Sequence, residues 1–541
     1  MGSYRLTDYG PLETRPAHRR AAYTPVQFAL LTATVLVLVW GALAFGAVYP
    51  WAYKPLSVCA ALTGLLALTV GRRGRPPFLV LATVLGCLGL AIALQLAPMP
   101  AATVARVSPA AQPLEARYRE GFGVLAPIAA ETPAVDGRQS LSIAPQRTAV
   151  GLFLFAAFAL FCLGVSRLLS STGASAIGKP LVGFGVALAL FGILSSVLTA
   201  GVHDPLIYGV WKPQFSAHPF GPFVNPNHFA GWMLMAAPIA LALFYDAFQR
   251  TIDEAKGSHG DGMAFVASPH FSGIMLYGLA AALMGVSLVM TRSRSGITAL
   301  AAASTVIAWI VLRRQRGAKA KIAVFTSFLI VMIGTAAWAG LDTVADKFAV
   351  SGVSDTFIIS GERDQQLGAQ SGRLVAWKDT IRIIRDFPLT GTGFNTYGTA
   401  MTVYQSALRD VHFQEAHNDY LQIAAEGGLL VGVPALLVLM IFARDVRRRF
   451  RESPKEGTTY WLRVGAAIGL LAIGLQSLFE FSLQMPGNAA LFAVLAAIAL
   501  HQSPRLRTAR TSQRPEVRPL QPGERSFRVL KSTQTSFPVD T

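Results

Sequence analysis

Apolar residues in this chain gather in runs long enough to cross a lipid bilayer, and no other feature limits the fold as strongly. The hydrocarbon core of a bilayer is about 30 Å thick, which an α-helix crosses in about 20 residues. Charged residues make up only 14% of the chain, compared with about 25% in soluble domains. The sequence therefore predicts an all-α polytopic integral membrane protein.

Twelve of these runs have the character of transmembrane helices. The first follows a basic segment and exceeds the apolar core of about 7–15 residues in a signal peptide, so we expect it to be retained. Two runs, 55–70 and 487–501, are short for a complete crossing. The predicted spans are 26–48, 55–70, 78–97, 148–166, 181–200, 228–247, 271–290, 295–312, 322–340, 428–443, 461–480 and 487–501.

Positive charge is distributed unevenly between the segments that join these spans. With the N-terminus in the cytoplasm, 31 of the 47 Lys and Arg residues fall on the cytoplasmic side. Membrane proteins carry this excess of Lys and Arg in their cytoplasmic loops, so we expect an N-in, C-in protein. The same asymmetry accounts for the net charge of +18, and we expect no nucleic-acid partner.

This topology divides the chain into five parts. A cytoplasmic segment at 1–25 precedes the nine spans within 26–340, which enclose an outer loop at 98–147. A large outer loop with amphipathic helices follows at 341–427, and the last three spans lie within 428–501. The tail at 502–541 is basic and rich in Pro, Ser and Gln, and we expect it to be disordered in the cytoplasm.

Signatures of metal and nucleotide sites are missing from the sequence. It contains no P-loop and no HExxH motif. Cys59, Cys87 and Cys162 lie in apolar runs, away from a CxxC pattern or a histidine, so we expect neither a metal site nor a disulfide. We predict that the protein uses no metal and no cofactor.

Distinctive polar motifs gather on the predicted outer face. Asn225 and Asn227 flank a proline before the sixth span, where Asn227 can cap the helix or the pair can form a polar lip for a sugar. Arg292 and Arg294 lie in the outer turn between the seventh and eighth spans, against the usual charge bias. A guanidinium group binds phosphate at two points, but an arginine can also snorkel from a helix end.

The large outer loop contains an amphipathic helix that begins near Arg373. Leu374, Trp377, Ile381 and Ile384 recur at helical spacing and predict one apolar face. We expect this helix to lie on the outer leaflet or to pack on the bundle. Arg373 would then lie near the lipid headgroups, either as an anion ligand or as a solvated charge.

His417 lies directly before the tenth span, at or near a helix start. Histidine suits proton transfer near neutral pH because its unperturbed pKa is about 6.5, although His417 can instead cap the helix or face headgroups. Asp419 and Glu426 are candidate partners that orient such a base, with Tyr420 between them. Glu480, near the outer end of the eleventh span, can line the same cavity.

Arginines and a histidine base that face outward at bilayer depth point to a lipid-linked phosphate substrate. No ATP pool exists outside the cytoplasm, so a transfer reaction there needs a donor that carries its own activated leaving group. A sugar linked to a polyprenyl diphosphate meets this condition.

The order of these motifs resembles that of the O-antigen ligase and polymerase superfamily of bacterial envelope proteins. The resemblance runs from about residue 140 to about residue 500. Its matching pieces are Leu141-Ser142 with Thr148, Asn225 to Asn227, Ser293-Arg294, Arg373, the His417 to Leu421 segment with Glu426-Gly427, and Phe479-Glu480-Phe481 with Pro486 and Asn488.

The resemblance implies a fold related to the GT-C glycosyltransferases, in the bacterial inner membrane, with its active site facing the periplasm. It also implies a metal-independent, inverting transfer of glycan from an undecaprenyl diphosphate-linked donor. Arg294 and Arg373 would hold the diphosphate, and His417 would deprotonate the acceptor hydroxyl. Residues with supporting roles would be Arg292, Asn225, Asn227, Asp419, Tyr420, Glu426 and Glu480.

Ligases and polymerases share these motifs, so the sequence leaves both activities open. The acceptor would be lipid A-core or another glycan, within O-antigen or exopolysaccharide biosynthesis, and other polysaccharide-assembly proteins would be partners. The alternative is a transporter or flippase of lipid-linked sugar. Such a protein would carry polar residues through its membrane interior, whereas few ionisable residues here lie in the middle of a span.

Overall fold

A computed structural model describes most residues of the chain between 23 and 502. The N-terminal segment through residue 22, the predicted span 322–340, the first part of the large outer loop and the tail from residue 503 lie outside the described residues. The described ranges are 23–70, 76–114, 138–202, 204–213, 218–257, 265–266, 268–314, 362–407, 412–452 and 456–502.

The described chain is mostly helical, with one short antiparallel pair of strands, β1 (Met99–Pro100) and β2 (Arg138–Gln139). Two 3₁₀ turns occur, η1 (Phe45–Ala47) and η4 (Ser482–Gln484). The helices are α1 (Pro25–Leu43), α2 (Pro50–Val70), α3 (Pro76–Leu94), α4 (Ala101–Val107), α6 (Pro145–Thr172), α7 (Ser175–Leu198), α8 (Pro226–Gly257), α10 (Phe271–Met290), α11 (Arg294–Arg314), α14 (Glu362–Asp386), α15 (Tyr397–Tyr404), α16 (Asp419–Glu452), α17 (Thr458–Gln476) and α18 (Pro486–Leu500).

Within the described ranges, eight helices are long and apolar enough to cross a membrane: α1, α2, α6, α7, α8, α10, α16 and α17. Three further predicted spans coincide with shorter apolar helices, Leu79–Leu94, Arg294–Ile310 and Pro486–Leu500. The prediction of a helical, multi-spanning membrane protein is therefore confirmed. The number of twelve spans and the relation to GT-C enzymes remain predictions.

Helix α8 lies at the centre of the bundle and packs against α7, α10, α11 and α17. Of the most apolar stretch of 18 residues in α8, 89% is buried inside the protein, compared with 11% for the corresponding stretch of α16. Phe229 and Trp232 are among its fully buried side chains. The outer end of α8 is thus shielded by protein on several sides, and this end carries the Asn225–Asn227 motif.

Helices α2 and α6 approach each other closely where two glycines meet. A Cβ atom on Gly164 would lie 2.1 Å from the carbonyl oxygen of Gly64, so no side chain fits at this contact. Helix pairs in membranes commonly pack through such small residues, because lipid offers no hydrophobic drive for their association.

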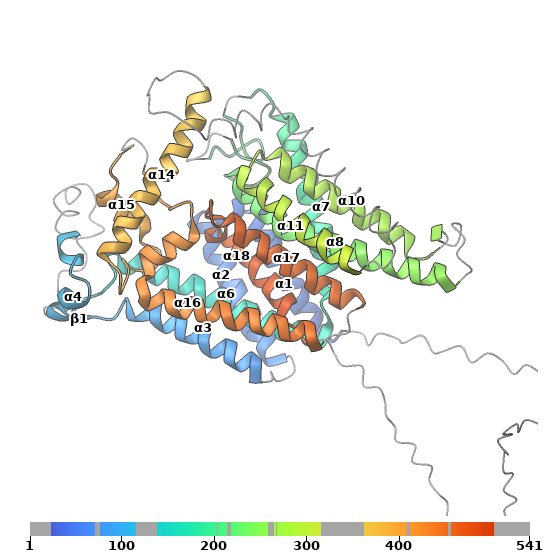
Figure 1. The fold of residues 1–541 in the computed structure, drawn as a ribbon, viewed down its shortest axis with the longest axis horizontal. Helices are drawn as coiled ribbons and strands as arrows, with labels where there is room; N and C mark the ends of the chain where they lie inside the picture. The colour runs from blue at the N-terminus through green and yellow to red at the C-terminus, as the bar shows by residue number, and fades with distance from the viewer. Residues whose placement is uncertain are drawn as a thin grey trace, which may run out of the picture. The chain divides into compact units, whose positions relative to one another are not determined.

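The large outer loop places α14 and α15 beside the start of α16, while α3 runs alongside α16 (Figure 1). Leu374 and Ile381 of the predicted apolar face of α14 are exposed and do not pack on the bundle, which leaves the outer leaflet as the predicted location of this face. The helix instead buries a mixed face that contains Ala376, Asp379 and Ile383. Asp379 is satisfied there, because its Oδ2 accepts hydrogen bonds from the backbone and hydroxyl of Ser406, at 2.9 and 3.0 Å.

Helix α16 begins at Asp419, earlier than the predicted span at 428, and bends at Gly428. Gln95, just after α3, holds this bend against the turn that follows α14. Its side-chain nitrogen donates to the carbonyl oxygens of Thr390 and Glu426, at 2.8 and 2.9 Å, and its side-chain oxygen accepts from Phe394 N at 2.9 Å. Gln95 therefore joins the end of α3 to the turn after α14 and to the bend in α16.

Candidate functional site

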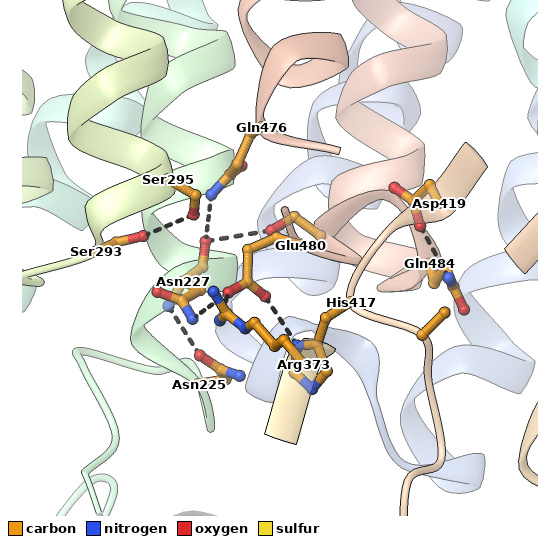
Figure 2. Close-up of polar contacts among 12 residues, drawn as sticks. Asn225, Asn227, Ser293, Ser295, Arg373, His417, Asp419, Gln476, Glu480 and Gln484 are labelled. Carbon is orange, nitrogen blue, oxygen red and sulfur yellow. Dashed lines mark hydrogen bonds and ion pairs between the residues drawn. The ribbon is translucent and has the colours of Figure 1, made fainter. Parts of the chain in front are cut away.

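The carboxylate of Glu480 is the centre of a polar cluster formed by four segments (Figure 2). Glu480 lies between α17 and η4, and its side chain is 1% exposed. Its Oε1 accepts a hydrogen bond from Asn227 Nδ2 at 2.8 Å and pairs with the guanidinium group of Arg373. Its Oε2 faces His417 Nδ1 at 3.5 Å. One buried carboxylate therefore connects the start of α8, α14 and the segment before α16.

The Asn225–Asn227 motif is built by the start of α8. Asn225, not Asn227, caps this helix: its Oδ1 accepts from the backbone N–H of Asn227 at 2.8 Å. Proline at position 226 favours this earlier start because its fixed φ suits the first helical residue. The side chain of Asn227 is consequently free to reach Glu480, and its carbonyl oxygen accepts hydrogen bonds from Gln476 and Ser482, at 3.1 and 3.2 Å.

His417 has a left-handed backbone, with φ of 52°, an uncommon conformation for a residue other than glycine. Both of its neighbours are held. Ala416 donates to Gln422 Oε1 and accepts from Trp377 Nε1, each at 2.9 Å. Asn418 donates from its side chain to the carbonyl oxygen of Leu478 at 2.9 Å. The surrounding contacts therefore fix the strained backbone and direct the imidazole toward Glu480.

The ring of Phe481 packs between two histidines. Its centroid lies 4.8 Å from that of His417 and 4.8 Å from that of His228, in edge-to-face geometry in both cases. The side chain of His417 is 26% exposed, so a ligand can reach it, whereas His228 is buried.

The three arginines predicted for the site occupy different environments. Arg373 pairs with Glu480 and is 30% exposed. Arg294 is half-buried, and its positive charge lies close enough to Arg373 for the two to repel each other. Arg292 is exposed and has a left-handed backbone. The structure thus brings Arg294 and Arg373 together and leaves Arg292 at the surface.

Arg294 is also the first residue of α11, where the backbone carries partial positive charge. Ser293 caps this helix, since its hydroxyl accepts from Gly296 N at 3.2 Å. Two guanidinium groups and a helix N-terminus that face one region repel one another unless an anion binds between them. This electrostatic arrangement suits a phosphate-bearing ligand.

The pKa of Glu480 is shifted by opposing effects. Burial by itself raises the pKa of a carboxyl group, but the neighbouring His417 and the charge of Arg373 favour the charged form more strongly. The pKa of Glu480 consequently lies below its ordinary value. Its surroundings therefore favour a negative charge within reach of the imidazole of His417.

The residues predicted to orient His417 make their contacts elsewhere, and this part of the prediction is wrong. Glu426 accepts from the backbone N–H groups of Asn395 and Tyr397, at 2.8 and 3.0 Å. Asp419 accepts from Gln484 Nε2 at 2.8 Å. Glu480, 63 positions after His417, faces the imidazole instead.

Tyr420 is a supporting residue in the prediction, but it faces away from this cluster. Its side chain is half exposed, and its hydroxyl donates to the carbonyl oxygen of Gly474 at 2.8 Å. It therefore ties α16 to α17.

Several residues that support the cluster belong to none of the motifs found in the sequence. Gln422 lies one helical turn after Asn418, and this spacing could have pointed to it. Gln476 and Gln95 give no such signal, because each acts through contacts with segments remote in sequence. Among the described residues, no three His, Cys, Asp or Glu side chains lie where they could hold a metal ion.

Taken together, the helices and the cluster define a polytopic helical membrane protein in which Arg373 and a histidine share a buried carboxylate, with Arg294 near Arg373. Residues 279–436 match a family model described as O-antigen ligase. This match confirms the predicted resemblance to the O-antigen ligase and polymerase superfamily over that region, which is less than a third of the chain. A comparison with curated proteins gives no significant match.

The matched region contains Arg294, Arg373 and His417, whereas Asn227 and Glu480 lie outside it. The family supports a function of the O-antigen ligase or polymerase type, which is the transfer of glycosyl groups, and implies lipid-linked glycan substrates in a membrane context.

Proposed function

We propose that this protein transfers a glycan from an undecaprenyl diphosphate-linked donor to an acceptor hydroxyl at the periplasmic face of the bacterial inner membrane. The observation that carries the proposal is that Arg373 and His417 lie against the same buried carboxylate, with Arg294 near Arg373, and that these three residues fall within the region that matches the family. A diphosphate needs cationic partners, and the acceptor hydroxyl needs a base.

In the proposed reaction the acceptor oxygen attacks the anomeric carbon and forms the new glycosidic bond with inversion. The bond between the anomeric carbon and the diphosphate oxygen breaks, and its electron pair leaves with the prenyl diphosphate. Arg294 and Arg373 stabilise the charge that develops on this leaving group. The proton of the acceptor passes to His417, whose Nε2 lies on the ring edge away from Glu480.

This chemistry involves no resident metal or cofactor, because the donor supplies the activated leaving group and arginines replace a cation at the diphosphate. The donor fixes the class of substrate but leaves the acceptor open. Transfer to lipid A-core would make the protein a ligase, and transfer to another lipid-linked repeat unit would make it a polymerase.

The test is the profile of lipid-linked and cell-surface glycans in cells that lack the protein and carry wild type or His417→Ala. We expect His417→Ala to insert normally and to fail in transfer. His412→Ala is the matched control, because His412 is exposed on the same loop and lies outside the cluster. We expect that variant to restore the normal profile.

The same profile separates the two activities. Long glycans that remain on the carrier lipid would indicate a ligase, and single repeat units on the carrier would indicate a polymerase. Normal glycan products from a stably inserted His417→Ala protein would rule out its role as the base. A normal profile in a knockout without a redundant enzyme would reopen the transporter or flippase alternative.

A further inference from the structure

Glu480 is shared between two groups with different tasks in the proposed reaction. Its Oε1 is occupied by Asn227 and Arg373, whereas its Oε2 faces His417 Nδ1 at 3.5 Å. Apart from this long contact, neither Oε2 nor Nδ1 has a hydrogen-bond partner among the described residues, although both atoms are buried. Buried polar atoms without partners are unfavourable, so the pair between Glu480 and His417 is incomplete in this arrangement.

Arg373 is the member of the cluster that a ligand can draw away. Its side chain is 30% exposed, whereas that of Glu480 is 1% exposed. A diphosphate carries more negative charge than one carboxylate and can accept both arms of a guanidinium group. Glu480 cannot follow Arg373 outward, because Asn227 holds its Oε1 and the start of α8 is anchored to Gln476 and Ser482.

We propose that binding of the donor diphosphate draws Arg373 away from Glu480 and leaves this carboxylate to pair with His417 Nδ1. Glu480 is then a positioning residue that completes the base only when the donor is present. This inference rests on the proposed function, and it describes how donor binding completes the catalytic base. Pairing at Nδ1 fixes the tautomer of the ring and leaves Nε2 as the atom that accepts the proton.

Charged and titratable groups from four helices and from the link between α17 and η4 face this region. Glu480 is joined by Arg373 of α14, Arg294 of α11, His228 of α8 and Asp419 of α16. A bound diphosphate would neutralise the two arginines and would by itself favour protonation of His417. A decisive experiment must therefore separate the charge of the ligand from the contribution of Glu480.

The experiment measures how fast diethyl pyrocarbonate modifies His417 across a range of pH, by peptide mass spectrometry of the purified full-length protein. The probe is farnesyl diphosphate, a prenyl diphosphate without a sugar, whose binding is measured separately by equilibrium dialysis. In wild type we expect the probe to raise the midpoint of the modification curve by about one pH unit, the size expected for a newly paired opposite charge.

Glu480→Gln keeps the size of the side chain but removes its charge, so we expect it to lose most of this shift. Asp386→Asn is the matched control, because Asp386 is an exposed carboxylate on α14 that binds Tyr404 at 2.5 Å. We expect its shift to equal that of wild type.

Arg373→Gln provides a second test if Glu480→Gln does not fold. With Arg373 removed, Glu480 is already released, so we expect the raised midpoint without the probe. An unchanged midpoint in this variant would contradict the proposal.

An equal shift in Glu480→Gln and wild type would show that the charge of the ligand acts alone, and would overturn the inference. Binding of the probe without any shift in wild type would overturn it as well, while leaving the proposed function in place. Failure of the probe to bind would contradict the proposed function itself.

Discussion

Burial and nearby charge shift the pKa values of carboxyl groups at the site in opposite directions. Burial raises the pKa of Glu480, but His417 and Arg373 favour its charged form and bring the pKa below its ordinary value. Glu415, two positions before His417, shows the opposite balance. Burial raises its pKa to about 8, the negative charges of Glu426 and Asp419 add to the rise, and the hydrogen bond from Gln422 only partly offsets it. The pKa values of Glu480 and Glu415 are thus shifted in opposite directions.

The raised pKa of Glu415 predicts a pH-dependent loss of stability. Unfolding returns this carboxyl group to its ordinary pKa of 4.5, so the unfolded chain releases the proton at lower pH than the folded chain does. The contribution of Glu415 is therefore fully present below about pH 4.5 and is lost as the pH rises toward 8. We expect Glu415→Gln to match wild type at pH 5 and to be more stable by about 1–2 kcal/mol at pH 8.

This expectation is checked by the apparent thermal unfolding midpoint of the purified protein as a function of pH. Glu456→Gln, a substitution of an exposed glutamate, is the control and should follow wild type throughout. A parallel pH dependence of Glu415→Gln and wild type would contradict the assigned protonation.

At the scale of elements, helix α16 contributes to the candidate site at its start and is also long and apolar enough to cross the membrane. Its N-terminal part lies beside α14 and α15, and its C-terminal part is basic, with Arg449 and Arg451 in the last turn. Gly428 interrupts it with φ of 52° and ψ of −153°, a conformation that only glycine adopts readily. At this bend Leu429 N donates to the carbonyl oxygen of Pro388 at 2.9 Å, so the loop after α14 docks onto α16.

Gly428→Ala should disturb this docking. A Cβ atom there would lie 2.6 Å from Gly391 N, in addition to the strain of the backbone conformation. We expect a loss of stability of about 2 kcal/mol or more, together with reduced transfer, because the same loop supports the His417 segment.

The control is Gly432→Ala, one turn further along α16, where an added Cβ atom meets nothing within 4 Å. Its apparent unfolding midpoint and activity should equal those of wild type. Equal behaviour of the two variants would show that the bend at Gly428 is not required.

Helix α14 shows what sequence periodicity leaves open. Its apolar stripe predicted one apolar face, on the outer leaflet or on the bundle, and in the structure Leu374 and Ile381 of this face are exposed. In water an apolar stripe must turn toward the protein, whereas near lipid it can face outward at no cost. Hydrophobic spacing therefore identified the helix but not the side on which it packs.

At the scale of the whole molecule, α16 separates the candidate site from the basic segment after it. The part of α16 after the bend at Gly428, residues 429–452, extends about 36 Å, more than the roughly 30 Å of the hydrocarbon core. The His417 end and the arginine-rich end therefore suit opposite faces of the membrane. With the basic end in the cytoplasm, the site faces the periplasm, as the charge distribution of the sequence predicts.

Cysteine accessibility tests this orientation. In a variant without Cys59, Cys87 and Cys162, we expect Ala407→Cys to react with a membrane-impermeant maleimide in spheroplasts. Glu456→Cys, beyond the basic end of α16, should react only after the membrane is permeabilised. Both native positions are exposed, so access to the reagent depends on the side of the membrane. The reverse pattern would invert the topology and exclude a periplasmic site.

The sequence by itself determined the helical class, the positions of most spans and the motifs that carry Arg294, Arg373 and His417. These follow from local properties, because apolar length sets a span and residue type sets the chemistry that a side chain can perform.

Only the tertiary structure decided which groups meet. Glu480 faces His417 although 63 positions of sequence separate them. Asp419 and Glu426 are nearer in sequence, but Asp419 accepts a hydrogen bond from Gln484 and Glu426 accepts one from the backbone of Asn395. The physical reason is that helix packing brings the end of α17 to the start of α8 and to the segment before α16. The periodicity within one segment carries no information about its contacts with another segment.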